Sequence, residues 1–156
     1  MPKEIERKFL VNELPTNLQN YPKHEINQGY IRIEDDGTEE RVRKKGSKHM
    51  HTIKSGKGLI RQESERVISK EEFEKLWPST LGKRITKTRY EINFGDVIIE
   101  LDIYSGDLNA LIVAEIEFER ENKSLEFKPP SWFGNEITYD ERYKNKNLAI
   151  YGIPKT

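Results

Sequence analysis

Hydrophobic and polar residues alternate along most of the chain with the two-residue period of half-buried β-strands. Short segments rich in turn-forming residues, such as Asp35-Asp36-Gly37 and Phe94-Gly95-Asp96, separate the alternating stretches. The pattern predicts eight strands, at about 4–11, 24–34, 38–45, 48–55, 60–68, 83–93, 96–104 and 111–120. Because most connectors are short, neighbouring strands are expected to run antiparallel.

Two short helices are predicted outside these strands. Ser69 and Glu72 have the spacing of a capping box, which opens a helix that ends at Pro78. A second helix is expected to begin near residue 138 or 140 and to run to about 150, before Gly152 and Pro154. No repeat, linker or low-complexity tract interrupts the pattern, so residues 1–156 are interpreted as a single domain.

Charged and apolar positions fall on opposite faces of the predicted strands, because residues two apart point to the same side. In the first strand Glu4, Glu6 and Lys8 share one face, while Ile5 and Phe9 lie on the other. The charged faces of the later strands carry Arg41, Arg43, Lys54, Arg61, Glu63, Glu65, Lys87, Arg89, Glu100, Asp102, Glu115 and Glu117.

A charged face on one strand usually faces solvent, but the same division on seven of the eight strands favours a common interior. If the apolar faces pack outward against helices, closure of the sheet leaves a lumen lined by charge. Structural ion pairs alone are a poor explanation, because the desolvation of so many charges offsets their attraction. The sequence therefore predicts a mainly β (α+β) fold, a closed eight-stranded antiparallel β-barrel that forms a tunnel, with a few peripheral helices.

Composition limits the possible partners. Lys+Arg and Asp+Glu number 27 each, so no overall charge would attract nucleic acid or an anionic membrane. The chain has no cysteine, and it has no apolar run near the roughly 20 residues that span a bilayer. The amino terminus also lacks the apolar region of a signal peptide, and we therefore expect a cytoplasmic protein that binds a small molecule.

The residue types on the charged face suit a phosphate chain bound together with a metal ion. Arg offers a bidentate fork for phosphate oxygens and Lys a point charge. Carboxylates are the oxygen ligands that hard divalent cations such as Mg²⁺ require. An interior that carries both signs therefore favours phosphoryl transfer assisted by metal.

The segment Glu4-Ile-Glu-Arg-Lys8 matches the ExExK motif of the CYTH, or triphosphate tunnel metalloenzyme, superfamily. The resemblance covers nearly the whole chain and is specific because the motifs occur in order. They are Gly29-Tyr30, Arg41-Val-Arg43, Lys54, Glu63-Ser-Glu65, Lys87-Thr-Arg89, Glu100-Leu-Asp102, Glu115-Ile-Glu117, Trp132-Phe-Gly134 and Arg142-Tyr-Lys-Asn145. The last two resemble the end of short bacterial members.

The resemblance implies dependence on Mg²⁺ or Mn²⁺ and a substrate that ends in a triphosphate. The metal ligands that it implies are Glu4, Glu6, Asp102, Glu115 and Glu117. Glu63 and Glu65 would place a second metal or the attacking water, and Lys8 would lie near the reacting end. The implied phosphate-binding residues are Lys8, Arg41, Arg43, Lys54, Arg61, Lys87 and Arg89, with Lys144 reaching the substrate from the terminal helix.

Hydrolysis of inorganic tripolyphosphate to pyrophosphate and orthophosphate is the favoured activity. Thiamine triphosphatase, class IV adenylate cyclase and a binding module without turnover remain alternatives, and the oligomeric state is left open. His49 and His51 share the face that points away from the lumen and are interpreted as surface residues. The segment Ser55-Gly-Lys-Gly58 lacks P-loop spacing and is interpreted as a hairpin turn.

Overall fold

One antiparallel sheet forms most of the structure, a computed structural model that describes residues 5–56 and 62–155. Within these ranges the strand order is β5-β4-β3-β2-β6-β7-β8-β1-β9. The strands are β1 (Ile5–Val11), β2 (Lys23–Ile33), β3 (Glu39–Lys45), β4 (Lys48–Ser55), β5 (Gln62–Val67), β6 (Arg84–Phe94), β7 (Val97–Ser105), β8 (Ile112–Phe118) and β9 (Phe133–Glu136). The helices are α1 (Lys70–Leu76), α2 (Glu121–Glu126) and α3 (Asn145–Tyr151), with 3₁₀ turns at Leu18–Asn20, Trp77–Thr80, Gly106–Leu108 and Glu141–Tyr143.

The eight predicted strands are all present, and their ends differ from the prediction by a few residues. The predicted helix start is confirmed, because the Ser69 side chain accepts a hydrogen bond from the Glu72 backbone N–H at the start of α1, whereas the Glu72 carboxylate accepts one from Arg66. The predicted terminal helix is shorter than expected, since a 3₁₀ turn at Glu141–Tyr143 precedes α3. The sequence pattern did not predict β9 or α2.

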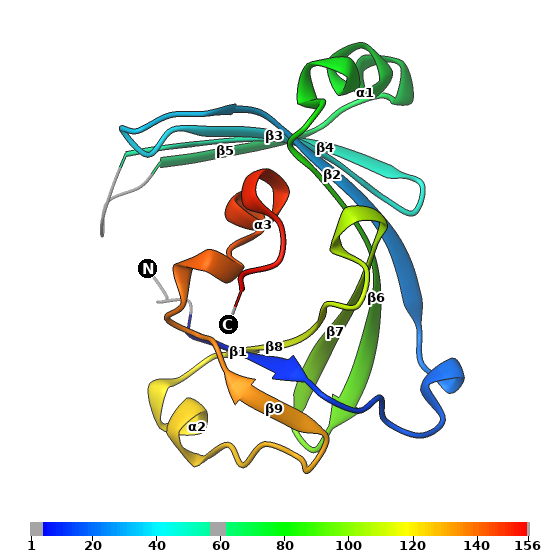
Figure 1. Cartoon of the computed structure of the whole chain (residues 1–156), viewed down its shortest axis with the longest axis vertical. Coiled ribbons are helices and arrows are strands. Elements are labelled where there is room, and N and C mark those ends of the chain that lie inside the picture. Colours follow the sequence, from blue (N-terminus) through cyan, green and yellow to red (C-terminus); the bar gives the residue numbers. More distant parts are fainter. Residues whose placement is uncertain (1–4, 57–61, 156) are drawn as a thin grey trace.

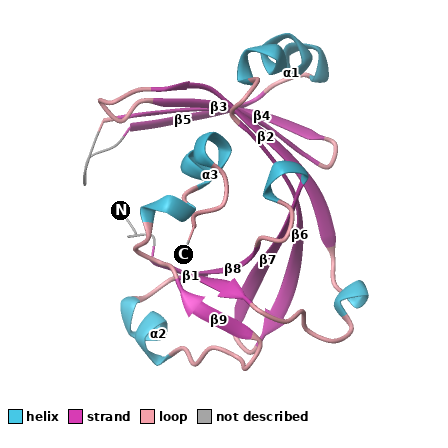
Figure 2. Cartoon of the chain, in the orientation of Figure 1, coloured by secondary structure: helices cyan, strands magenta, loops and turns pink. Residues whose placement is uncertain are grey.

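The predicted closure of the barrel is not confirmed by the residues that the structure describes. The sheet curves strongly but stays open, with β5 at one edge and β9 at the other (Figures 1 and 2). β1 pairs with β8 from Ile5 to Leu10 and with β9 at Phe9 and Val11. The Ile137 N–H also donates a hydrogen bond to the Lys8 carbonyl. Lys8 and Phe9 of β1 therefore have backbone partners on both sides.

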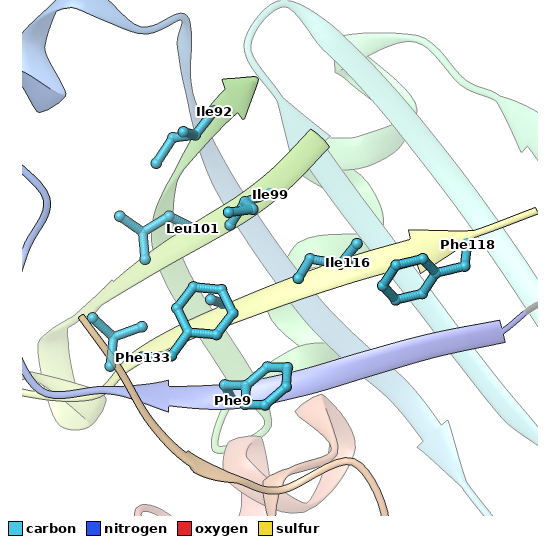
Figure 3. Packing of buried hydrophobic residues seen from close by; sticks show 9 residues of the cluster. Phe9, Ile92, Ile99, Leu101, Ile116, Phe118 and Phe133 are labelled. Carbon is cyan, nitrogen blue, oxygen red and sulfur yellow. The ribbon is translucent and has the colours of Figure 1, made fainter. Parts of the chain in front are cut away.

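Apolar side chains on the convex side of β1, β6, β7 and β8 form the main core. Phe9, Ile99, Leu101 and Ile116 are buried there beneath Phe133 at the start of β9 (Figure 3). Phe127 and Trp132 pack against the same cluster from the segment between α2 and β9. Burial of each such side chain stabilises the fold by about 1.5–3 kcal/mol. The prediction that apolar faces pack outward is thus confirmed on this half of the sheet.

A second convex cluster lies under α1 and corrects the interpretation of the two histidines. Phe73 of α1 packs with Val42 and lies beside His49, and His49 and His51 are only 7% exposed each. Their parity keeps them away from the charged face, as predicted. They are nevertheless not surface residues, because the His49 ring lies 5.1 Å from that of Phe73 and His51 Nε2 lies 2.7 Å from a Glu40 carboxylate oxygen. Parity alone could not show that a helix would cover them.

The charged face is the concave face of the sheet, and apolar packing of α3 covers part of it. Figure 1 shows α3 within the curve of the sheet. Tyr104, on the same face of β7 as Asp102, donates a hydrogen bond to Asn145 of α3 at 2.8 Å. Leu148 of α3 is buried in a cluster with Ile85 and Val113 from that face. Apolar packing therefore anchors α3 beside the charged side chains. None of the helices in the described ranges is long and apolar enough to cross a membrane.

Gly29→Ala should destabilise the fold because the close approach of β2 to the turn at Trp77–Thr80 leaves no room for a methyl group. A Cβ at Gly29 would lie 2.5 Å from Cβ of Thr80, which is fully buried. We expect a loss of about 1–3 kcal/mol in the free energy of unfolding, measured by urea denaturation. Gly134→Ala is the control, since its Cβ would meet the flexible side chain of Asn12. Equal losses in the two variants would contradict this account.

Candidate functional site

The strand register brings the predicted charged residues into one band across the concave face. On the acidic side Glu6 lies opposite Glu117, and Glu115 lies between Lys8 and Glu100 on its two neighbouring strands. Next along the sheet, Arg89 of β6 lies opposite Asp102 of β7. Arg41 and Arg43 of β3 follow beyond β2, then Lys54 of β4, which pairs with Glu63 of β5. Acidic side chains therefore gather on β1, β7 and β8, and basic ones on β6, β3 and β4.

A buried ion cluster occupies the centre of this band. The Asp102 carboxylate accepts hydrogen bonds from Arg89 Nε at 2.8 Å and Nη2 at 2.9 Å, and Lys87 Nζ lies 2.7 Å from it. Burial alone would raise the pKa of Asp102, but the Lys87 and Arg89 charges lower it below its usual value. Both Asp102 oxygens therefore face cations of the protein. In this structure Asp102 positions Lys87 and Arg89, and its predicted role as a metal ligand stays a prediction.

Two carboxyl groups meet at the acidic end of the band. A hydrogen bond with Glu115, followed by burial and the Glu115 charge, raises the pKa of Glu6 to about 8. Burial opposes ionisation of Glu115, but the hydrogen bond from Glu6 and the Lys8 charge bring its pKa below the usual value. The contact therefore raises the pKa of Glu6 and lowers that of Glu115, so Glu6 is the group on which it favours a proton. Two carboxyl groups in hydrogen-bond contact need a proton or a cation between them.

The Glu6 contact predicts an unusual pH dependence of stability in chelator. Because the folded pKa of Glu6 exceeds its ordinary value of 4.5, the folded state binds a proton that the unfolded state releases. The contribution of Glu6 is fully present below about pH 4.5 and is lost as the pH rises to about 8. The exposure of Glu6 reduces the size of this effect. We expect the melting temperature of wild type to fall between pH 5 and 8 relative to that of Glu6→Gln.

The control for this titration is Glu126→Gln, in the exposed part of α2. The difference in melting temperature between this variant and wild type should stay constant over the same pH range. A constant difference for Glu6→Gln as well would contradict the shared proton.

At the basic end of the band, burial together with the charges of Arg41 and Arg89 lowers the pKa of Arg43. This end also includes polar residues that carry no formal charge. Tyr30 of β2 is 1% exposed and accepts a hydrogen bond from the Gln28 side chain at 2.9 Å, beside Arg41. Tyr30 therefore lies among the site residues as well as being packed. Strand β2 lies between the basic residues of β3 and those of β6, and it thus contributes polar contacts without formal charge.

Two predicted carboxylates and one predicted lysine lie at the margins of the band. Glu63 and Glu65 are exposed on the edge strand β5. Lys144 Nζ lies 3.5 Å from Glu141, and the Lys144 side chain is 53% exposed. Glu4 and Arg61 lie outside the described residues. Their roles stay predictions.

Sequence reasoning gave no role to Glu100, although its parity placed it on the charged face. Its carboxylate accepts a hydrogen bond from Arg89 Nη1 at 3.1 Å. Burial, with the charges of Glu115 and Asp102, raises its pKa in spite of Arg89. Glu100 therefore links the acidic end to the buried ion cluster.

The carboxyl groups at the acidic end are oxygen donors of the kind that hard cations prefer. Within residues 5–56 and 62–155, no three carboxylate or imidazole groups converge closely enough to hold a metal ion. Glu6 and Glu115 nevertheless form a carboxyl pair, and a cation between them would relieve the same repulsion as a proton on Glu6. The band as a whole could thus hold a metal at its acidic end and an extended anion along its basic side.

Known proteins that are similar to this chain show the family to which it belongs. A protein from Nitrosomonas europaea, named inorganic triphosphatase, is 46% identical over 94% of this chain and 97% of its own length. A second inorganic triphosphatase, from Acetivibrio thermocellus, is 36% identical over 96% of this chain and 94% of its own. A crystal structure of an inorganic triphosphatase matches with a TM-score of 0.82 and 42% identity, covering 99% of both chains. The family model of the CYTH domain matches residues 2–148, and the chain belongs to the CYTH domain family.

Proposed function

We propose that the chain is a metal-dependent triphosphatase that hydrolyses inorganic tripolyphosphate to pyrophosphate and orthophosphate. The observation that carries the proposal is the single band of charge, in which carboxyl groups at one end adjoin Lys and Arg side chains that continue to β4. Both relatives named above carry the name inorganic triphosphatase, which supports the same reaction here.

Carboxyl groups at the acidic end would hold Mg²⁺ or Mn²⁺. Glu6, Glu115 and Glu117 are the proposed ligands in the described part, and Glu4 is a further ligand proposed from the sequence. Bound there, a divalent cation would neutralise phosphate charge during the transfer. The proton shared by Glu6 and Glu115 supports this assignment, because a cation that replaces it relieves the same repulsion.

The basic residues hold the substrate. Arg41, Arg43 and Lys54 bind phosphate groups from β3 and β4, and Lys87 and Arg89 contribute from β6. Lys8, opposite Glu115 on the neighbouring strand, places positive charge at the acidic end, where the reacting phosphoryl group would lie. Glu63 and Glu65 of β5 would place a second metal ion or the attacking water. Fixed cations that stabilise charge as it develops lower the barrier without reorganisation.

Hydrolysis in ¹⁸O-labelled water tests the reaction, with products followed by ³¹P nuclear magnetic resonance. Water attack at a terminal phosphorus puts the label in orthophosphate, whereas label solely in pyrophosphate would reverse the proposed direction of attack. Parallel assays with thiamine triphosphate and ATP measure the alternative substrates. Formation of cyclic AMP without cleavage of tripolyphosphate, or binding of tripolyphosphate without turnover, would refute the proposed function.

A further inference from the structure

Helix α3 is held at a fixed position across the concave face. Its first residue, Asn145, accepts the hydrogen bond from Tyr104 of β7 at 2.8 Å. Three residues later Leu148 is 1% exposed, in the apolar cluster with Ile85 and Val113. Both contacts come from the sheet face that carries the charged band. These two contacts fix the orientation of α3 relative to that face.

Lys146 reaches the basic side of the band from this helix. Its Nζ lies 3.8 Å from Oε2 of Glu39, whose side chain is only 10% exposed. Glu39 lies two residues before Arg41 on β3 and opposite Lys54 on β4, so its side chain shares their face. Lys146 therefore approaches the phosphate-binding residues at the position of Glu39.

The ion pair of Lys146 is longer and more exposed than that of Lys87, so a bound anion displaces it more readily. Lys87 lies 2.7 Å from Asp102, and both side chains are 2% exposed. The 3.8 Å distance to Glu39 is longer than a hydrogen bond, and the Lys146 side chain is 28% exposed. A loose, partly hydrated pair contributes little stability, so an anion of higher charge can take over the ammonium group.

We propose that Lys146 is a further substrate-binding residue, which Glu39 holds in place and which transfers to a phosphate group of the bound chain next to Arg41. Glu39 competes with the substrate for the same cation and so weakens binding. Lys146 is distinct in this respect from Lys144, which lies beside Glu141 on the surface. The inference rests on the proposed function, because it assigns one end of the proposed phosphate path.

Steady-state kinetics with tripolyphosphate test the proposal. Lys146→Ala should raise KM about tenfold, the loss of one charge-assisted contact, while kcat stays within about twofold. Lys146→Arg should stay near the wild-type KM because it keeps the charge. The matched control is Lys123→Ala, which removes a surface pair of similar length, 3.7 Å to Asp96, and should leave KM unchanged. Thermal melts establish that each variant is folded, and Lys146→Gln replaces the alanine variant if that one is not.

Glu39→Gln provides the second arm. Removal of the competing carboxylate should lower KM severalfold, and this gain should vanish when Lys146 is also replaced by alanine. An unchanged KM in Lys146→Ala, or a rise in Lys144→Ala alone, would overturn the inference while leaving the triphosphatase assignment standing. Absence of tripolyphosphate turnover in wild type would instead overturn the proposed function.

Discussion

Asp102→Asn should lower the free energy of unfolding by about 3–5 kcal/mol, because it leaves the buried Lys87 without its counter-charge and Arg89 with Glu100 alone. Lys87 and Asp102 are among the most buried charged side chains of the described residues, and Arg89 adds two hydrogen bonds to the same carboxylate. The amide of Asn keeps the shape of the side chain but not its charge. Urea denaturation of the two proteins at neutral pH measures the difference.

Glu136→Gln is the matched control for this variant. Glu136 also binds an arginine through two hydrogen bonds, from Arg7 at 2.9 and 2.8 Å, but its side chain is 38% exposed. An exposed pair of the same geometry contributes about 0–1 kcal/mol, so the loss should be several times smaller. Similar losses in the two variants would show that burial of Asp102 does not govern its contribution.

The strands and their charged faces could be predicted because period-two alternation is a local property. The predicted parity placed Glu6, Lys8 and Glu115 on one face, and the register of β1 and β8 places them there in the structure. Parity also places Glu100 on the charged face, although it does not indicate a role for this residue.

The open edge of the sheet could not be predicted, since it depends on which segment pairs with the second edge of β1. The four residues of β9, Phe-Gly-Asn-Glu, show no clear alternation and gave no strand signal. The position of α3 has the same origin. Its sequence predicts a helix, but only the contacts of Asn145 and Leu148 show that it lies on the charged face. Strand parity therefore gives no information about Lys146, and the role of Lys144 rests on the family resemblance alone.

Glu115→Gln should reduce kcat for tripolyphosphate about 100-fold or more, because it removes an anionic oxygen at the position proposed to hold the metal. Glu115 hydrogen bonds with Glu6 and lies opposite both Lys8 and Glu100, so it is central to the acidic end. Stability should not fall with activity, since Gln relieves the repulsion between two carboxyl groups. The same substitution should weaken binding of Mg²⁺ or Mn²⁺, measured by calorimetry.

Loss of turnover with an undiminished melting temperature would separate a metal-binding role for Glu115 from a structural one. Glu25→Gln, on the outward face of β2, supplies the control and should keep wild-type kcat. A chelator should abolish wild-type turnover, and added Mg²⁺ or Mn²⁺ should restore it. Hydrolysis at an unchanged rate in chelator would exclude a dissociable metal ion from the reaction. Wild-type kcat in Glu115→Gln would instead move the proposed ligands away from the Glu6–Glu115 pair.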